Sequence, residues 1–286
     1  MNRKEAAMNL RVVRRTTVNL LMYVILFGIS IFMILPFVWM ISTSFKLPQD
    51  VFGFPPMIIS PRSTLVNYQF LFEEKNLALI VWNTFFVAAS GTLLSLLFCS
   101  LGGYGFAKFR FPGRNVLFAM LLATMIIPGA VTMVPSFVLM RSFGWYNTFW
   151  PLIVPGAANA FGIFFMRQYI STINDELLDA ARIDGAGEFG IYWRVVMPIV
   201  LPGLTSLGLI FFMGAWNNYL GPLIWLKSPD KFTLPLAIFQ FGGAVGLTNY
   251  NGQMAMSVIS IIPLLIIFLA FQRRFVEGIT AGAVKG

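Results

Sequence analysis

The sequence predicts an all-α fold, a polytopic membrane bundle of six transmembrane helices. Hydrophobic residues make up 58% of the 286 residues and charged residues only 11%, whereas a typical soluble domain is about 25% charged. Six long stretches contain no Asp, Glu, Lys or Arg: 16–45, 76–107, 115–140, 142–166, 195–226 and 232–272. A spanning helix needs roughly 20 mostly apolar residues, so each stretch is long enough for one. A membrane β-barrel is excluded because its strands are short and alternate in hydrophobicity.

We place the six spans by these uncharged stretches. The predicted spans are about 20–43, 80–102, 116–139, 151–167, 203–225 and 253–272. Prolines 36, 128, 135, 155, 202 and 263 lie within or beside them and predict bends, since proline removes a helical donor. The single cysteine, Cys99, falls in the second span, which excludes a disulfide framework and favours a buried packing role.

The distribution of positive charge predicts the topology. Six spans place both termini on the same side, and that side carries fourteen of the twenty Lys and Arg residues. The positive-inside rule therefore puts both termini in the cytoplasm. The formal charge of +9 follows from this topology and from contact with anionic membrane lipid, so it is no evidence for nucleic acid binding.

One cytoplasmic loop is acidic although the chain is basic. This loop, residues 173–198, is called the acidic loop below. It holds five of the eleven acidic residues: Asp175, Glu176, Asp179, Asp184 and Glu188. Asn174 or Thr172 can cap a helix over 173–183, and Asp175 and Glu176 suit the positive end of its dipole. Gly185 is a helix stop, a second short helix can run to Arg194, and Pro198 begins the return to the membrane. Such a compact knob is a candidate docking surface for another protein, with an ordinary solvated loop as the alternative.

Several kinds of chemistry are absent from the sequence. There is no histidine and one cysteine, which excludes His/Cys metal sites and His-based catalysis. The span interiors carry no ionisable group of the kind that ion-driven carriers use. Gly185, Gly187 and Gly190 satisfy GxGxxG, but no buried strand precedes them, so a dinucleotide site is not expected. We therefore predict that the chain forms a membrane pathway, has no energy source of its own and is driven by a separate protein.

Specific motifs carry a resemblance to a known family. Residues 179–187, DAARIDGAG, followed by Pro198, resemble the EAA signature of permease subunits in binding-protein-dependent ABC importers. AWNNYLGPL at 215–223 and the C-terminal QRRFVEGITAGAVKG are similar to the carbohydrate-uptake branch, the maltose-type permeases. Asn83 and Thr84 open the second span as in these relatives, and the resemblance covers about residues 20–286. One departure is Asp179, which stands where the signature usually has Glu.

The resemblance implies a division of the chain and a set of partners. Residues 1–19 are expected to be a basic cytoplasmic N-terminus, 20–274 the six-span permease domain and 275–286 a Gly-rich cytoplasmic tail that reaches toward the ATPases. The partners implied are a homologous second permease, two ATPase subunits and an extracytoplasmic substrate-binding protein. ATP and Mg²⁺ would bind to the ATPases, so this chain is expected to be a transport subunit without catalytic residues, metal or cofactor.

The same resemblance assigns roles to particular residues. Coupling to the ATPases is expected at Glu176, Asp179, Ala180, Ala181, Asp184, Gly185, Ala186 and Gly187. A sugar is held by aromatic faces and by hydrogen bonds to its hydroxyls, so Trp216, Asn217, Asn218 and Tyr219, with Asn83, are candidates for the substrate path. The alternative at each asparagine is a hydrogen bond between helices of the bundle.

Three other functions stay open from the sequence alone. The first is an ABC permease for a non-sugar solute such as a peptide or a polyol phosphate, and an anionic solute would call for basic groups in the spans. The second is a secondary carrier, for which backbone carbonyls and asparagines would have to bind sodium. The third is a membrane enzyme, for which a catalytic acid or histidine near the membrane surface would be needed.

Overall fold

The computed structural model describes residues 3–55, 57–243 and 249–283, with side chains over 15–55, 57–241 and 249–272. Every regular element in these residues is a helix. The long helices are α1 (Arg3–Ser44), α4 (Leu77–Lys108), α11 (Met197–Trp216) and α14 (Tyr250–Ala283). The others are α2 (Pro48–Val51), α3 (Val66–Glu73), α5 (Arg114–Thr124), α6 (Gly129–Ser142), α7 (Trp150–Ile153), α8 (Ala160–Ile170), α9 (Asp175–Ile183), α10 (Glu188–Ile191), the π-helix η1 (Tyr192–Val196), α12 (Leu220–Trp225), the 3-10 helix η2 (Pro229–Lys231) and α13 (Leu234–Gly243).

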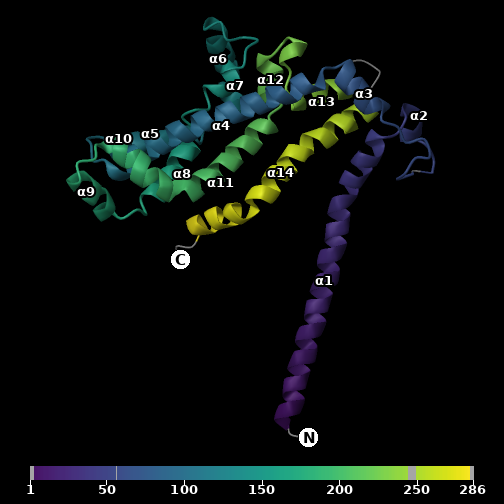
Figure 1. Ribbon diagram of the computed structural model, residues 1–286, viewed down its shortest axis with the longest axis horizontal. Helices are drawn as coiled ribbons and strands as arrows, with labels where there is room; N and C mark the ends of the chain where they lie inside the picture. The colour runs from purple at the N-terminus through teal and green to yellow at the C-terminus, as the bar shows by residue number, and fades with distance from the viewer. Residues whose placement is uncertain (1–2, 56, 244–248, 284–286) are drawn as a thin grey trace.

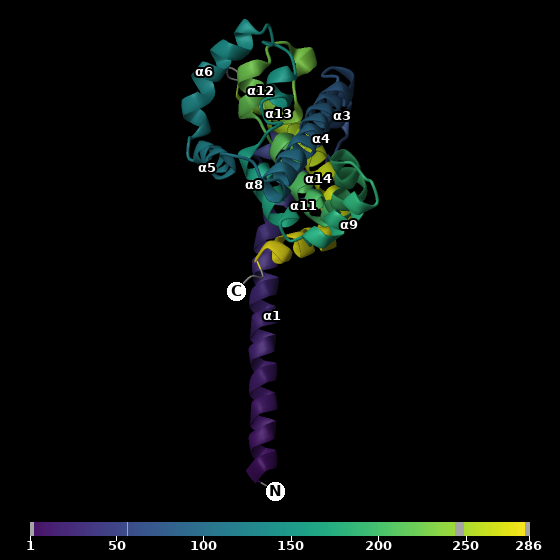
Figure 2. The same ribbon diagram turned by 90° about the vertical axis from the view of Figure 1, so that its left-hand side faces the viewer.

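The helices form an elongated bundle from which one helix diverges. α4, α8, α11 and α14 lie side by side, with α9 and α10 at one end and α2, α3 and α13 at the other (Figure 1). α5 and α6 arch outward on one side of the bundle (Figure 2). α1 meets α14 near its own C-terminal end and then runs away from the other helices. The end with α9 and α10 is the one that the charge distribution predicts to be cytoplasmic.

The expected membrane spans are present as apolar helices, but several are interrupted. Four helices are long and apolar enough to cross a membrane within the described residues: Arg15–Ser44, Leu77–Lys108, Glu188–Trp216 and Tyr250–Gln272. The predicted span 116–139 is a pair of helices, α5 and α6, bent by 97° at residues 125–128, and it makes a fifth span only if the pair is counted as one. The break ends at Pro128, whose ring cannot occupy a helix interior without loss of a hydrogen bond.

Two further predicted spans are also discontinuous. The span 151–167 is wrong as a single helix, because α7 ends at Ile153 and α8 begins only at Ala160. The span 203–225 is likewise split, because α11 ends at Trp216 and α12 begins at Leu220. A membrane protein tolerates such non-helical backbone where protein surrounds it or where it lines a cavity. The absence of charge predicted a membrane segment in each case, and that absence alone does not indicate where a helix breaks.

The connections between spans also carry regular structure. The connection after α1 contains the short helix α3. In the connection 227–250, α13 reaches Gly243 and α14 begins at Tyr250. Residues 244–248 and 284–286, the latter in the predicted C-terminal tail, lie outside the described residues. The rest of that tail, up to Ala283, continues α14 as a helix.

Glycines allow α4 and α8 to pack closely. A Cβ at Gly103 of α4 would lie 2.6 Å from the Met166 Cβ of α8 and 2.8 Å from the Arg167 backbone nitrogen. A Cβ at Gly162 of α8 would lie 2.6 Å from the Cys99 sulfur. Small residues at such positions let two helix backbones approach within a membrane. Cys99 is fully buried here, which confirms its expected packing role.

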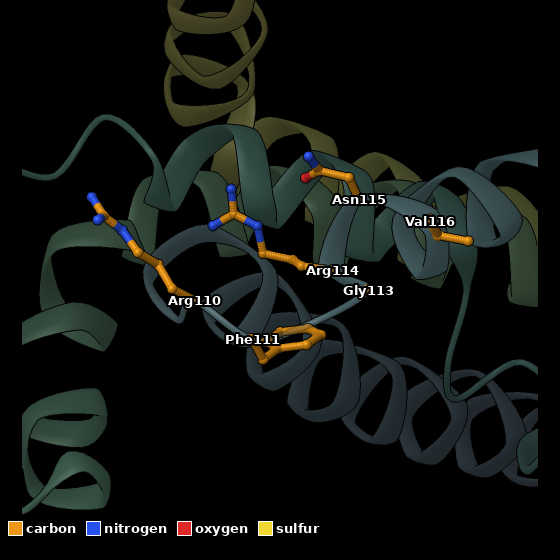
Figure 3. A pocket seen from close by; sticks show the side chains of 6 residues that line it. All are labelled: Arg110, Phe111, Gly113, Arg114, Asn115 and Val116. Atoms are coloured by element: carbon orange, nitrogen blue, oxygen red, sulfur yellow. The ribbon is translucent and has the colours of Figure 1, made fainter.

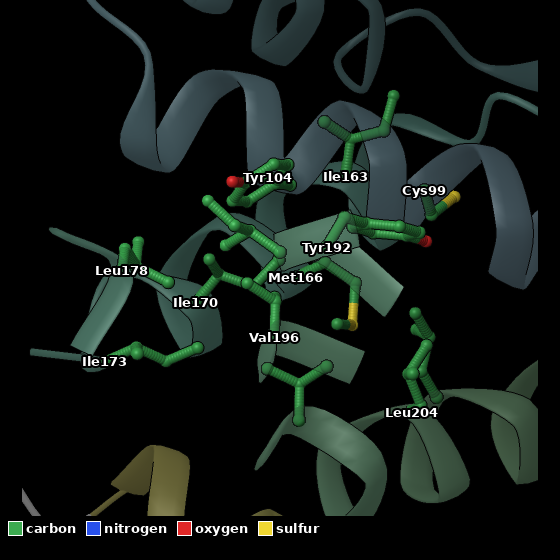
Figure 4. Close-up of a cluster of buried hydrophobic side chains, with 13 residues drawn as sticks. Cys99, Tyr104, Ile163, Met166, Ile170, Ile173, Leu178, Tyr192, Val196 and Leu204 are labelled. Carbon is green, nitrogen blue, oxygen red and sulfur yellow. The ribbon is translucent and has the colours of Figure 1, made fainter. Parts of the chain in front are cut away.

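Two buried clusters lie toward opposite ends of α4. The first contains thirteen residues from α4, α8, the acidic loop and α11, among them Tyr104, Met166, Leu178 and Tyr192 (Figure 4). The second joins α3, α4, α11, α13 and α14 around Leu77 and Trp216. α4 therefore takes part in both cores and connects the two ends of the bundle.

Candidate functional site

The acidic loop folds into two short helices joined at a glycine. α9 begins after Asn174, whose side-chain oxygen accepts a hydrogen bond from the Glu176 backbone N–H at 3.2 Å. Asp175 and Glu176 occupy the first turn of α9, as its dipole favours. Gly185 follows with a φ of +85°, a backbone conformation that residues with a Cβ rarely adopt. The Asn174 cap and the Gly185 stop are thus confirmed, whereas α9 begins at Asp175 and not at the predicted residue 173.

The second half of the loop runs without interruption into α11. α10 begins after Gly187 and passes into the π-helix Tyr192–Val196, which continues directly as α11 from Met197. The second helix therefore reaches Arg194, as expected, but Arg194 does not end it. Pro198 lies in the first turn of α11, and because the helix is continuous from α10, its missing N–H removes one donor from the hydrogen-bond ladder just after the π-helix. A π-helical turn of this kind is rare and occurs often at functional sites.

Apolar side chains fasten the loop to the end of the bundle. Leu178 of α9 is 1% exposed and Ile191 of α10 is fully buried, and both belong to the cluster shown in Figure 4. Tyr192 is also buried, and its hydroxyl lies 2.6 Å from the Ser100 hydroxyl on α4. Ala181 and Ala186 are half-buried against the same cluster. The loop is therefore packed as part of the core.

Arg182 holds the two short helices together. Its guanidinium donates to the Asp179 carboxylate at 2.6 Å and to the Glu188 carboxylate at 2.8 Å and 3.3 Å. The Tyr104 hydroxyl of α4 donates to the Glu188 carboxylate at 2.9 Å. These charge-assisted bonds raise the pKa of Arg182 above its ordinary value. Asp179 is thus paired within this chain, through a partner that the sequence reading did not identify.

Lys108, the last residue of α4, holds the start of the loop. Its ammonium donates to the Ile173 carbonyl and to the Asp175 carboxylate, each at 2.6 Å. The Lys108 side chain is 6% exposed, whereas that of Asp175 is 76% exposed. The hydrogen bond from Lys108 holds the pKa of Asp175 below its usual value.

The outer face of the loop combines charge with exposed apolar side chains. Ile183 is 86% exposed and Phe189 is 69% exposed, on either side of Gly185. The predicted coupling residues on this face are exposed as well: Glu176, Asp179, Ala180, Asp184, Gly185 and Gly187. Sequence reasoning missed Ile183 and Phe189, although large apolar residues beside a glycine turn in an acidic loop were the available signal. Large apolar side chains that are exposed among charged ones indicate a candidate site for protein contact.

A basic cavity lies close to the loop. It has a volume of about 370 Å³ and is lined by Arg110, Phe111, Gly113, Arg114, Asn115 and Val116 (Figure 3). Arg114 donates to the Phe109 carbonyl at 3.1 Å. The charge of Arg110 acts on Asp175 and lowers the pKa of that carboxyl further. The predicted cytoplasmic end of the bundle thus presents a basic surface beside an acidic one.

The Trp216–Tyr219 tract lies in the break between α11 and α12. Trp216 is 1% exposed, and its indole N–H donates to the Ser260 carbonyl at 3.1 Å. Asn217, Asn218 and Tyr219 are exposed. The Asn217 amide donates to the Met213 carbonyl, and the Asn218 side-chain oxygen accepts from the Gly221 N–H. The tract therefore places two amides and one phenol at a surface, with Trp216 held in the core behind them.

The hydrogen bonds of Asn83 go to a segment other than this tract. It is 4% exposed, and its amide nitrogen donates to the Asp230 carbonyl at 2.8 Å and to the Phe232 carbonyl at 3.2 Å. The neighbouring Thr84 hydroxyl accepts from the Leu234 N–H at 2.7 Å. These bonds join α4 to residues 230–234, which run from η2 into the start of α13. Asn83 therefore has the role that the sequence analysis gave as the alternative, a hydrogen bond between helices of the bundle.

Known proteins resemble this chain along nearly its whole length. The arabinooligosaccharides transport system permease protein AraQ of Halalkalibacterium halodurans is 35% identical over 96% of this chain and 100% of its own length. The lactose transport system permease protein LacG of Rhizobium radiobacter is 34% identical over 95% of this chain and 98% of its own. The sequence similarity therefore extends over the acidic loop, the tract and the spans alike.

A solved structure agrees with the fold. A chain in the crystal structure of a bacterial ABC transporter involved in the import of the acidic polysaccharide alginate superimposes with a TM-score of 0.82. The match has 25% sequence identity and covers 92% of this chain and 98% of that one. Residues 99–281, which include the acidic loop, match the family described as binding-protein-dependent transport system inner membrane component. The chain belongs to this family, as a multi-pass membrane permease of a binding-protein-dependent ABC importer.

Proposed function

We propose that this chain is a permease subunit that imports a sugar or oligosaccharide, driven by ATP hydrolysis in separate subunits. The relatives named for arabinooligosaccharides and lactose support a carbohydrate cargo. With a homologous second permease the chain forms the translocation path, an extracytoplasmic binding protein delivers the sugar, and two ATPases bind below. ATP and Mg²⁺ bind to those ATPases.

The proposed topology has six crossings of the bacterial inner membrane. The four long apolar helices supply four, and the broken segments α5–α6 and α7–α8 supply two. Residues 1–19 and 275–286 are then both cytoplasmic, and residues 20–274 form the permease domain with the acidic loop on its cytoplasmic side. The bias of Lys and Arg toward that side supports this arrangement.

The acidic loop is proposed to be the surface on which an ATPase docks. The observation that carries this proposal is the exposure of Ile183 and Phe189 beside Gly185, on a knob whose inner face is anchored by Leu178. Glu176, Asp179, Ala180 and Asp184 form the rim, and Ala181, Ala186 and Gly187 shape the turn. Because the loop continues as α11, a push on the knob moves a membrane helix.

The Trp216–Tyr219 tract is proposed to contribute to the sugar path. Asn217, Asn218 and Tyr219 are exposed, and amides and aromatic rings are the groups that bind sugar hydroxyls and sugar faces. Trp216 supports them from the core, and Asn83 acts at a distance through the segment that it holds. The split between α11 and α12 leaves Asn217, Asn218 and Tyr219 at a helix break, a kind of backbone that membrane proteins tolerate where it lines a cavity.

A pair of glycine substitutions tests the docking surface. Gly185 and Gly144 both have positive φ, +85° and +72°, and a Cβ at either glycine meets nothing within 4 Å. Gly185→Leu and Gly144→Leu therefore impose similar backbone strain, of about 1–2 kcal/mol, but only the first adds bulk to the proposed docking face. We expect Gly185→Leu to lose ATPase subunits during purification, or to hydrolyse ATP without uptake of labelled arabinooligosaccharide or lactose.

The control variant defines the interpretation of this experiment. Gly144→Leu should insert, assemble and transport as the unchanged complex does. Normal assembly and normal uptake in Gly185→Leu would refute the docking role of the loop. Sugar transport by the purified chain alone, indifferent to ATP, would refute the proposed function as a whole.

A further inference from the structure

α4 differs from the other long helices in its continuity. It runs for 32 residues without an internal proline, whereas α1, α11 and α14 contain Pro36, Pro202 and Pro263. At 1.5 Å per residue it is about 48 Å long. Proline interrupts the hydrogen-bond ladder and permits bending, so α4 is the long helix best suited to move as one body.

Besides the contact of the Ser100 and Tyr192 hydroxyls, two side chains near the cytoplasmic end of α4 bond the starts of the two short helices of the acidic loop. Lys108 bonds the Ile173 carbonyl and the Asp175 carboxylate where α9 begins. Tyr104, one helical turn earlier, bonds Glu188 where α10 begins. Glu188 is in turn bonded to Arg182 of α9. Both ends of the knob are therefore fastened to a helix that the chain does not connect to it directly.

These contacts are shielded from water on the side of α4. The Lys108 side chain is 6% exposed and Tyr104 is 5% exposed. Tyr104 also packs on the rings of Phe109 and Tyr192, with centroids 5.2 Å and 5.6 Å away. Figure 4 shows Tyr104 beside Tyr192 in the cluster that anchors the loop. Loss of a hydrogen bond from a buried ammonium is costly, because water does not readily take the place of the acceptor.

The opposite end of α4 is bonded to a second distant segment. Asn83 donates to the carbonyls of Asp230 and Phe232, and Thr84 accepts from the Leu234 N–H. All of these groups are buried or partly buried. The segment 230–234 lies at the end of the bundle away from α9 (Figure 1).

We infer that Lys108 and Tyr104 are positioning residues that make α4 follow the acidic loop, so that movement of the loop reaches the segment 230–234 through α4 as well as through α11. The inference rests on the proposed function, because the loop moves only if an ATPase grips it. α11 follows the loop through the covalent chain, whereas α4 follows it through side-chain contacts, in which Lys108 and Tyr104 hold the starts of α9 and α10. The two routes are therefore separable by substitution.

Thiol labelling in the full complex tests the inference. The complex of this chain with its partner permease and ATPases carries one added cysteine, at Trp82→Cys on α4 or at Met213→Cys on α11. Both positions are exposed, at 58% and 40%, whereas the native Cys99 is fully buried. The rate of labelling by N-ethylmaleimide is measured without nucleotide and after trapping with ATP and vanadate. We expect trapping to change the rate at both positions.

Removal of the tether should affect α4 alone. In Lys108→Met the trapping-induced change at position 82 should fall at least about fivefold, the lower end of typical coupling between sites, while the change at position 213 persists. Tyr104→Phe, which removes one hydroxyl from a packed ring, should act in the same direction. Lys108→Arg should retain the response, because a guanidinium also donates to both acceptors. Arg110→Met is the matched control, since its charge acts on Asp175 and no hydrogen bond from it to the loop is present in the described residues.

Each outcome has one meaning. The inference is overturned if trapping changes the labelling rate at position 82 as much in Lys108→Met and Tyr104→Phe as in the unchanged chain. It is also overturned if trapping changes the rate at position 213 but not at position 82 in the unchanged chain. No change at either position in the unchanged complex refutes the proposed docking of ATPases on the loop, which is a different failure. A general loss of structure would reduce both responses and the yield of complex together, and Lys108→Arg would not rescue it.

Discussion

Gly103 illustrates how one residue determines a helix contact in this protein. Its Cα lies against the α8 backbone, so a methyl group there would meet the Met166 Cβ at 2.6 Å and the Arg167 nitrogen at 2.8 Å. Backbone atoms cannot move aside as the end of a flexible side chain can. The glycine is thus required by packing, although any residue except proline would have a higher helix propensity at this position of α4.

We expect Gly103→Ala to destabilise the chain by about 1–3 kcal/mol, the usual cost of overpacking. Gly105→Ala is the matched control, because it lies in the same helix and its Cβ would meet nothing within 4 Å. The measurement is the midpoint of thermal unfolding of the two variants in one detergent. Equal midpoints would contradict the close approach of α4 and α8.

At the scale of single elements, the acidic loop shows how local and distant contacts combine. Asn174, the acidic first turn and Gly185 define α9 from within the segment. Its position on the bundle depends instead on Lys108 and Tyr104, which lie 67 and 84 residues from their carboxylate partners. The loop is thus a locally encoded helix pair that the rest of the chain orients.

The bond between Lys108 and Asp175 predicts a pH dependence. The pKa of Asp175 is lowered in the folded chain, chiefly by the hydrogen bond from Lys108. A carboxylate with a lowered pKa stabilises the fold above its unfolded pKa, about 3.9, and this contribution is lost as the pH falls through the folded value. Amide hydrogen exchange over residues 170–178, corrected for the intrinsic effect of pH, should therefore keep its Lys108-dependent protection from pH 7 to about pH 4.

The comparison variant for this measurement is Lys108→Met, which has no bond to lose and should show no such pH-dependent step. Loss of protection in the unchanged chain between pH 7 and pH 5 would contradict a lowered pKa. It would mean that the carboxyl is protonated above its ordinary range.

At the scale of the whole molecule, α1 stands apart from the bundle. Leu20, Phe27 and Ile34 repeat at intervals of seven residues along it and are 64%, 69% and 56% exposed. α1 contacts α14 only near its own C-terminal end (Figure 1). These side chains of α1 are exposed in the isolated chain, so in a membrane their neighbours are lipid or another subunit.

We expect α1 to lie against the homologous partner permease in the assembled transporter. Leu20→Cys, Phe27→Cys and Ile34→Cys, each labelled with a benzophenone maleimide, should form photo-crosslinks to the partner in membranes. The same labels should give no such product when the partner gene is deleted. Crosslinks to lipid alone in the complete complex would contradict this arrangement.

The sequence by itself determined the class of the molecule and its local signals. Uncharged stretches identified the membrane segments, because lipid excludes charge regardless of how the helices pack. Caps and glycine stops identified α9, because these signals act within a few residues. The DAARIDGAG motif identified the family, since it is a local pattern.

The tertiary structure alone decided which helices break and which side chains meet. The breaks at 125–128, 154–159 and 217–219 lie in stretches as free of charged residues as the unbroken ones. Pro128 and Pro155 fall in two of the breaks, as the predicted bends suggested, but Pro36, Pro202 and Pro263 lie inside helices that continue, so proline alone does not identify a break. Asn83 with Asp230, Tyr104 with Glu188 and Lys108 with Asp175 are far apart in the chain, and no local pattern pairs them. Hydropathy depends on each residue's own transfer from water, whereas these contacts depend on where other helices bring their partners.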